Sequence, residues 1–315
     1  MHLYLPIAEV SLDVFLLLGL GAAIGFLSGL FGVGGGFLVT PLLIFLGVPP
    51  AIAAATGANT VIAPSVSGVV SGLRRGGVDL RMGFVLLAGG LAGSAASVGL
   101  FGLLRRVGQI DLVVSLSYVA LLGTIGSLML SESIQAWRRR QLGPAAPRRK
   151  LHKHLWIHGL PLKMRFPQSR LYISALLPIG IGFAVGVLSG IMGVGGGFIM
   201  VPAMIYVLGM PTAVVVGTSQ FQIVFVSANV TILQSIGNQA VDIALATALI
   251  VGSIVAAPIG TRVGAKLRGD QIRILLALMV LAVAVQLGIN LVVRPADLYS
   301  ATIPTGAVPT EPPQP

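Results

Sequence analysis

A glycine-rich motif that occurs twice carries the strongest chemical signal in the sequence. The first copy contains Gly34, Gly35 and Gly36, and the second contains Gly195, Gly196 and Gly197, 161 residues further on. Consecutive glycines allow left-handed backbone conformations, in which successive N–H groups form a concave nest that favours anions. A short apolar segment follows each copy, and the N-terminus of a helix there adds positive potential. The pair therefore predicts a site for a small anion.

Polar side chains in a second pair of stretches are further candidates for this site. They are Thr56, Asn59, Thr60, Thr218, Ser219, Gln220 and Gln222. Polar groups in apolar spans are costly unless they are hydrogen-bonded. Two interpretations stay open: these side chains contact the substrate, or they cap and bridge neighbouring helices. We include them with the six glycines in the predicted substrate-binding site.

Groups for acid–base or metal chemistry are missing from the apolar segments. All nine carboxylates and all four histidines lie at segment ends or in loops. The chain contains no cysteine, which excludes disulfides, thiolate metal sites and thiol catalysis. Ser28 and Ser189 have no membrane-embedded His or Lys base that could activate them. We therefore predict that the protein is not an enzyme and uses no metal or cofactor.

The composition places the chain in a membrane. Of 315 residues, 55% are hydrophobic and 9% are charged, and the mean hydropathy is +0.97. Apolar runs near 20 residues recur, the length that crosses a hydrocarbon core of ~30 Å. The first run, residues 12–31, has no basic stretch before it and is predicted to be a retained span rather than a signal peptide. The fold class is an all-α polytopic membrane protein of the cell (cytoplasmic or inner) membrane.

The glycine motif is part of an internal duplication. Residues 19–41 match residues 180–202 at 14 of 23 positions without gaps. Paired broken helices in two related halves indicate the binding site of membrane carriers. The alternative is that the glycines only permit close helix packing. The duplication and the abrupt break favour the binding site.

Each homologous half contains about five helical segments, one of them short or broken. The segments are residues 12–33, 36–48, 51–72, 83–104 and 110–130, and then 171–193, 197–209, 212–235, 242–264 and 271–292. About 13 helical residues rise only ~20 Å, which is too short to span a membrane alone. The short segments are therefore half-helices that carry the chain across, or re-entrant hairpins.

Charge distribution distinguishes these two topologies. If the short segments carry the chain across, the halves are inverted, and 17 Lys and Arg lie inside against 3 outside. If they are re-entrant, the halves are parallel and the split is 14 to 6. Because basic residues collect on cytoplasmic loops, the inverted repeats are favoured, with both termini outside. The same rule accounts for the net charge of +11, so no nucleic-acid partner is predicted.

The chain divides into four predicted regions. Residues 1–130 form the N-terminal transmembrane repeat, 131–170 a basic cytoplasmic linker, 171–293 the C-terminal repeat and 294–315 a disordered tail. The linker is interpreted as a topological anchor, with contact to anionic lipid headgroups as the functional alternative. Its His152, His154 and His158 lack a further ligand for a metal site. A homodimer is left open.

These motifs resemble the TauE/SafE family of sulfite exporters over about residues 12–292. The resemblance rests on the two Gly-x-Leu-Ser-Gly…Gly-Val-Gly-Gly-Gly-Phe…Pro motifs and on Gly217-Thr218-Ser219. It implies transport of sulfite or organosulfonates. Relatives in this family carry Thr-Glu-Ala-Asn-Gln in the first half, where this chain has Gly57 and Thr60 in place of the Glu and Gln.

The resulting hypothesis is a secondary transporter that exports a small sulfur oxyanion by alternating access. The substrate is expected between the two glycine-rich breaks. A monoanion leaving a negative-inside cell gains ~2.3 kcal/mol per 100 mV, so export needs no coupled proton. Two alternatives are a carrier for another small organic anion, such as a carboxylate, and a membrane receptor that senses an anion without transporting it.

Overall fold

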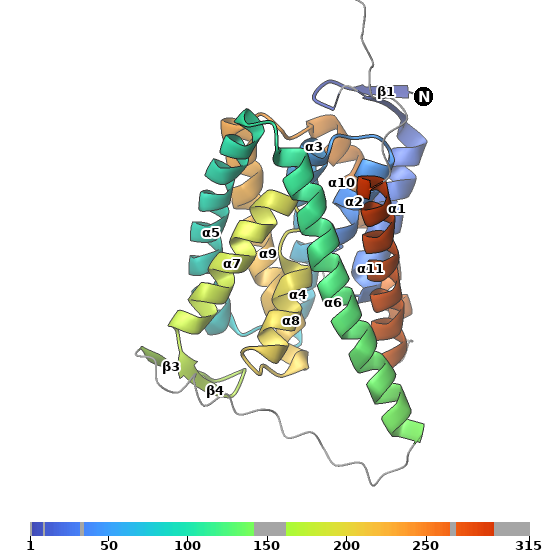
Figure 1. The fold of residues 1–315 in the computed structure, drawn as a ribbon. Helices are drawn as coiled ribbons and strands as arrows, with labels where there is room; N and C mark the ends of the chain where they lie inside the picture. Colours follow the sequence, from blue (N-terminus) through green and yellow to red (C-terminus); the bar gives the residue numbers. More distant parts are fainter. Residues whose placement is uncertain (1, 9, 32–34, 142–161, 265–268, 293–315) are drawn as a thin grey trace, which may run out of the picture.

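The computed structural model describes residues 2–8, 10–31, 35–141, 162–264 and 269–292, and these are mostly helical (Figure 1). In the first half the helices are α1 Val14–Phe31, α2 Gly36–Phe45, α3 Pro50–Thr60, α4 Ile62–Arg74, α5 Leu80–Arg106 and α6 Ile110–Gln141. In the second half they are α7 Leu176–Met192, α8 Gly197–Tyr206, α9 Thr212–Gly237, α10 Ile243–Gly264 and α11 Gly269–Val292.

The helices confirm the predicted all-α polytopic membrane protein. Within the described residues, seven helical stretches are long and apolar enough to cross a membrane, with α3 and α4 forming one of them. The helices α2, α7 and α8 are shorter and also apolar. The predicted segment 51–72 divides at Val61, where α3 ends and α4 begins. Helix α6 continues beyond residue 130, into the predicted linker.

Two antiparallel hairpins were not predicted from the sequence. Strands β1 His2–Leu5 and β2 Val10–Asp13 pair with each other, as do β3 Lys163–Phe166 and β4 Leu171–Ser174. Strands of four residues are too short for an alternating pattern to be recognised. The two hairpins lie at opposite ends of the helix bundle, and α1 and α7 begin at those opposite ends (Figure 1).

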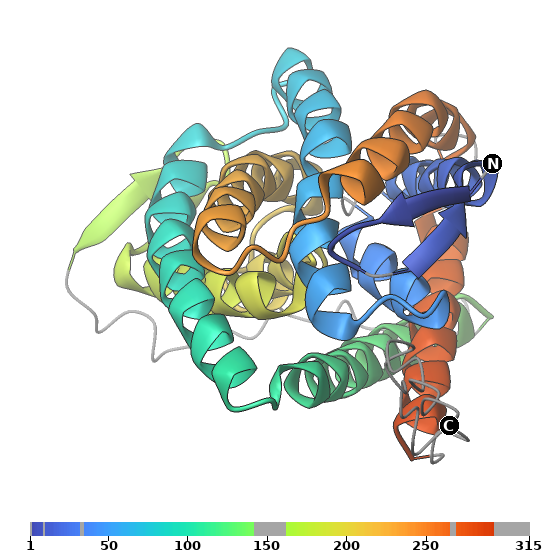
Figure 2. The same ribbon diagram turned by 90° about the horizontal axis from the view of Figure 1, so that it is seen from above.

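The two halves interleave rather than form separate blocks (Figure 2). Helix α1 packs along α10, α5 along α7 and α6 along α11, so each pair takes one helix from each half. Helix α4 of the first half also packs beside α9 of the second half. The interface between the halves is therefore the core of the molecule.

Glycines permit close approach in two of these helix pairs. A Cβ added at Gly93 of α5 would lie 2.1 Å from the carbonyl oxygen of Phe183 in α7. Likewise, a Cβ at Gly252 of α10 would lie 2.3 Å from the carbonyl oxygen of Leu18 in α1. Within a membrane, such close backbone packing replaces the hydrophobic driving force that operates in water.

A buried aspartate ties the first hairpin to the second half. The carboxylate of Asp242 accepts hydrogen bonds from Leu245 N (3.1 Å) and from Ile7 N (3.2 Å) in the β1–β2 turn. The backbone N–H of Asp242 donates to Thr56 Oγ1 at 3.1 Å. Asp242 therefore caps the start of α10 and joins two points of the first half to it.

The other end of the bundle repeats this arrangement with the halves exchanged. The carboxylate of Asp79 accepts hydrogen bonds from Met82 N (3.1 Å) and from Ser169 Oγ (2.6 Å) between β3 and β4. The backbone N–H of Asp79 donates to Thr218 Oγ1 at 2.9 Å. Asp79 and Asp242 thus fasten the two halves crosswise, one at each end.

We expect Gly93→Ala to destabilise the protein and Gly99→Ala to leave its stability unchanged or slightly higher. Overpacking costs about 1–3 kcal/mol at Gly93, because the new methyl meets backbone that cannot turn away. Gly99 lies in the same helix with no atom within 4 Å of an added Cβ, and Ala favours a helix by up to ~1 kcal/mol. Equal thermal unfolding of the two purified variants would contradict the packing assignment.

Thr218→Val and Thr218→Ser separate a structural role of this residue from a role in substrate binding. We expect Val to lower the free energy of unfolding by about 1–3 kcal/mol, because the buried Asp79 N–H loses its acceptor. Ser keeps the hydroxyl and most of the stability. Denaturant unfolding without substrate measures both variants, and an unchanged stability of Thr218→Val would exclude the structural role.

Candidate functional site

The two glycine-rich breaks meet at the interface between the halves. Gly35 has φ of 63° and precedes α2, and Gly196 has φ of 79° and precedes α8. A Cβ added at Gly36 would lie 2.2 Å from the carbonyl oxygen of Val194. The rings of Phe37 and Phe198 stack with their centroids 4.7 Å apart. The first turns of α2 and α8 therefore face each other.

Side chains of the first half satisfy backbone carbonyls near the second break. The carbonyl oxygen of Met192, the last residue of α7, accepts hydrogen bonds from Thr40 Oγ1 (3.2 Å) and Tyr118 OH (2.8 Å). Both side chains are fully buried. The carbonyl end of α7 is therefore neutralised by the protein, whereas the positive ends of α2 and α8 converge from the two halves.

The predicted glycines fall into three groups. Gly35, Gly36, Gly196 and Gly197 form the starts of α2 and α8. Gly195 has φ of 72°, and a Cβ added to it would lie 2.9 Å from Ser227 Oγ. Gly34 lies outside the described residues. The left-handed conformations expected of these motifs are present at Gly35, Gly195 and Gly196.

Most of the predicted polar residues already make hydrogen bonds within the protein. Thr56 and Thr218 belong to the crosswise aspartate contacts. Thr60 Oγ1 donates to Gly57 O (2.8 Å) and Ser219 Oγ to Val216 O (2.9 Å), inside their own helices. Such bonds fit the interpretation that these side chains cap and bridge helices.

The remaining three polar candidates lie in different surroundings. Asn59 is half-buried in α3. Gln222 packs against Gly90 of α5, and its Nε2 has no hydrogen-bond partner among the described residues. Gln220 lies against Gly68 of α4 and lines a cavity. Of the predicted polar residues, Gln220 is the one that lines this cavity.

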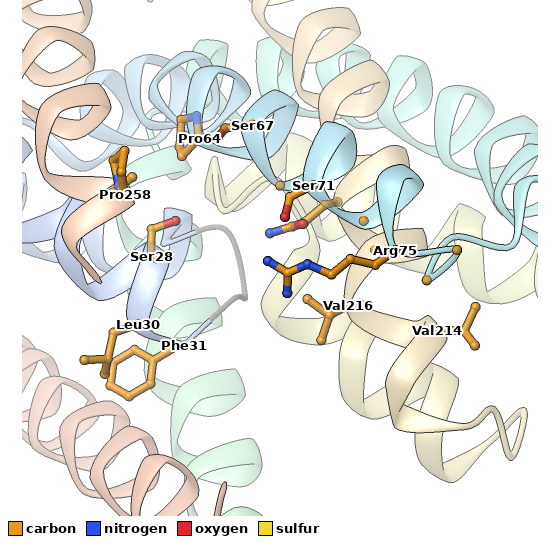
Figure 3. Close-up of a pocket in the computed structure, with 18 residues that line it drawn as sticks. Ser28, Leu30, Phe31, Pro64, Ser67, Ser71, Arg75, Val214, Val216 and Pro258 are labelled. Carbon is orange, nitrogen blue, oxygen red and sulfur yellow. The ribbon is translucent and has the colours of Figure 1, made fainter. Parts of the chain in front are cut away.

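The cavity lies between the halves and has a volume of about 700 Å³. Its walls are the last turn of α1, one face of α4, the start of α9 and residues 257–258 of α10 (Figure 3). Ser28, which is 4% exposed, lies on the side of the first break, where it packs against Gly35. Arg75, at the end of α4, is exposed. The cavity therefore extends from the molecular surface to the edge of the first break.

On the side of the second break, polar contacts bridge α9 to α5 and to α7. Asn229 Nδ2 of α9 donates to Ser94 Oγ of α5 at 2.8 Å, and Gln234 Nε2 donates to Gly190 O of α7 at 3.2 Å. Ser189, the counterpart of Ser28 in the second motif, is fully buried. A separate cavity of about 680 Å³ lies beyond these contacts, at the end of α5. The molecule is thus asymmetric about its two breaks.

The sequence does not reveal two features of this site: Ser28 as a cavity residue and Arg75 as a charge within the cavity. Asn229 is a weaker polar candidate from the sequence, and the structure shows that it bridges helices through Ser94. The Leu-Ser-Gly sequence around Ser28 was considered only as a possible nucleophile. Arg75 was counted as a topological charge. Both copies of the motif have a serine at this position, Ser28 and Ser189, and this repetition is the signal that could have identified Ser28. Among the described residues, no group of three or more His, Asp or Glu side chains could hold a metal ion.

Comparison with known proteins identifies relatives along most of the chain. The chain is 27% identical to the probable membrane transporter protein YunE of Bacillus subtilis, covering 86% of this chain and 96% of that protein. It is 29% identical to a probable membrane transporter protein of Xylella fastidiosa, covering 85% and 92%. No solved structure is significantly similar to it.

A protein-family model also matches the chain and identifies the family that it belongs to. The model described as sulfite exporter TauE/SafE matches residues 17–287, which contain both glycine-rich breaks, the cavity and both buried aspartates. This match covers most of the sequence and agrees with the resemblance found in its motifs. The chain therefore belongs to the TauE/SafE family.

Proposed function

We propose that this protein is a secondary membrane transporter that exports a small sulfur oxyanion, sulfite or an organosulfonate, by alternating access. The family and the names of the relatives support membrane transport. The observation that carries the proposal is the cavity that reaches Ser28 beside the first glycine break, while polar contacts bridge the equivalent helices on the other side.

In the proposed mechanism, the two inverted repeats move relative to each other. The side with the cavity closes, and the side bridged by polar contacts opens. The hairpins at opposite ends and the opposite starting points of α1 and α7 support the inversion (Figure 1). The crosswise bonds of Asp79 and Asp242 support it as well, because each end uses the same residue types with the halves exchanged. Inverted repeats around one central site let a rocking motion open either end.

The orientation follows from the basic residues near the cavity. Arg74, Arg75 and Arg81 lie around the α4–α5 turn, at the end where the cavity reaches the surface. The positive-inside rule assigns this end to the cytoplasm. The cavity of this structure then receives substrate from the cytoplasm, as export requires.

The substrate site is proposed at the two breaks, where the N-termini of α2 and α8 converge. Gly35, Gly36, Gly195, Gly196 and Gly197 supply the backbone, with Gln220 and Ser28 on the cavity side. Among the described residues, none that lines the cavity is a carboxylate. Membrane potential alone then drives a monoanion outward by ~2.3 kcal/mol per 100 mV.

A second candidate function is transport of another small organic anion, such as a carboxylate. The observation that favours it is the size of the cavity, about 700 Å³, which falls in the range of sites for organic ligands larger than sulfite. Carboxylates and sulfonates present similar oxygen acceptors to N–H donors. The two classes differ in charge distribution and in shape.

Flux measurements in proteoliposomes test the proposal and separate the two candidates. We expect sulfite flux that accelerates when the potential favours movement of the anion, with sulfoacetate and acetate as competitors for identification of the cargo. A flux that does not respond to potential rejects the uncoupled mechanism. Absence of flux for all three anions rejects transport of small oxyanions.

Two glycine variants provide a matched test of the central break. Gly195 and Gly209 both have positive φ, 72° and 71°, so alanine strains the backbone equally at both positions. Gly195 lies at the break against Ser227, whereas an added Cβ at Gly209 meets no atom within 4 Å. We expect Gly195→Ala to abolish most of the flux and Gly209→Ala to retain it. Equal flux in the two folded variants would contradict a site at the break.

A further inference from the structure

One face of α4 lines the cavity along almost its whole length. The lining residues recur every three or four positions and are Pro64, Ser67, Gly68, Ser71, Gly72 and Arg75. Residues at this spacing share one side of a helix. The stripe carries two hydroxyl groups, on Ser67 and Ser71, and ends in the cation of Arg75. Apolar side chains lie on exposed faces of the same helix: Val66, Val70 and Leu73. This face of α4 therefore places two hydroxyl groups and a positive charge along the cavity.

The guanidinium of Arg75 extends from the end of α4 into the cavity, close to Ser71 and on the side toward Ser28 (Figure 3). The backbone N–H of Arg75 donates to Gly72 O at 3.2 Å, but its guanidinium makes no ion pair or hydrogen bond with any residue in the described part of the chain. The nearest carboxylate along the sequence, Asp79, is 1% exposed and is occupied by Met82 and Ser169. No carboxylate in the described part of the chain therefore compensates the positive charge in the cavity.

Two other arginines, Arg74 and Arg105, differ from Arg75 in their surroundings. In the second cavity, Arg105 Nη1 donates to the carbonyl oxygen of Asn238. Arg74, next to Arg75, is exposed and does not line the cavity. A topological anchor needs only a charge at the membrane surface, and Arg74 meets that requirement. The position of Arg75 inside the cavity is not needed for anchoring.

We propose that Arg75, together with Ser71, forms a receiving site that binds the oxyanion of the cargo at the mouth of the cavity. A guanidinium presents parallel N–H donors that match two oxygens of a sulfonate, sulfite or carboxylate. A cleft with low-dielectric walls concentrates the field of the cation and raises the local concentration of anions. The inference rests on the proposed anion transport. It adds a charged side chain to a site predicted from backbone groups and neutral polar side chains.

The absence of cysteine from the chain allows a test that does not depend on the cargo. Ser67→Cys places a single thiol on the cavity-lining face of α4. Its reaction rate is measured with an anionic, sulfonate-bearing thiosulfonate and with a cationic, trimethylammonium-bearing one of similar size. The ratio of the two rates reports the potential in the cavity.

We expect Arg75→Gln to lower this ratio roughly fivefold or more, because the field of a unit charge in a cleft acts with opposite sign on the two reagents. Arg74→Gln is the matched control and should leave the ratio nearly unchanged, and Arg75→Lys should preserve most of it. A ratio that does not respond to Arg75→Gln, or that falls as much with Arg74→Gln, overturns the proposal.

Flux measurements with the same arginine variants, on the otherwise unaltered chain, connect the site to transport. We expect Arg75→Gln to raise the KM for sulfite several-fold with a smaller change in kcat, and Arg74→Gln to alter neither. An unchanged KM in a transporting Arg75→Gln protein would show that the cargo does not use this site. If the original chain transports none of the tested anions, the proposed function fails, while the thiol ratio still decides whether Arg75 sets the anion preference of the cavity.

Discussion

Backbone groups released by a broken helix have no water to bind inside a hydrocarbon layer, and the rest of this structure depends on how they are satisfied. At the end of α7, Thr40 and Tyr118 of the first half bind the released carbonyl of Met192. At the starts of α10 and α5, Asp242 and Asp79 cap the free N–H groups. Each partner comes from the protein itself, and most of them link the two halves.

The N–H groups at the starts of α2 and α8 are different. They follow glycines in left-handed conformations and face each other across the interface between the halves. A helix N-terminus carries a partial positive charge, and among the described residues no carboxylate lines the adjoining cavity. This arrangement suits a small anion that is bound briefly and then released. A fixed carboxylate at the same place would compete with such a cargo.

The duplication explains both the symmetry and the asymmetry of the molecule. Residues that hold the fold occur in exchanged pairs, such as Asp79 with Thr218 and Asp242 with Thr56. Residues around the breaks have diverged in their contacts, although Ser28 and Ser189 occupy equivalent motif positions. Ser28 lines a cavity, whereas Ser189 is fully buried. A carrier with alternating access requires both arrangements of the motif, one beside an open cavity and one buried.

Much of the fold follows from the sequence because apolar length and glycine breaks act locally. The bounds of most helices and the left-handed glycines at both breaks were predicted from these signals. The hairpins and the aspartate caps were not, because they depend on pairs such as Ile7 with Asp242, which are 235 positions apart. The role of Arg75 was missed for a related reason. Charge counting assigns a residue to one side of the membrane, but it does not show whether the side chain turns into a cavity.

The proposed exchange of open and bridged sides can be tested with single thiols at the positions of Ser28 and Ser189. Asn229→Ala removes the 2.8 Å contact with Ser94 and should favour the conformation that opens the bridged side. Loss of one hydrogen bond of about 0.5–1.5 kcal/mol shifts such an equilibrium roughly twofold to tenfold. We therefore expect Asn229→Ala to raise the labelling rate of Ser189→Cys from the face opposite Arg75 by this factor, without raising that of Ser28→Cys. An unchanged rate at Ser189→Cys, or an equal rise at both thiols, would contradict alternating access.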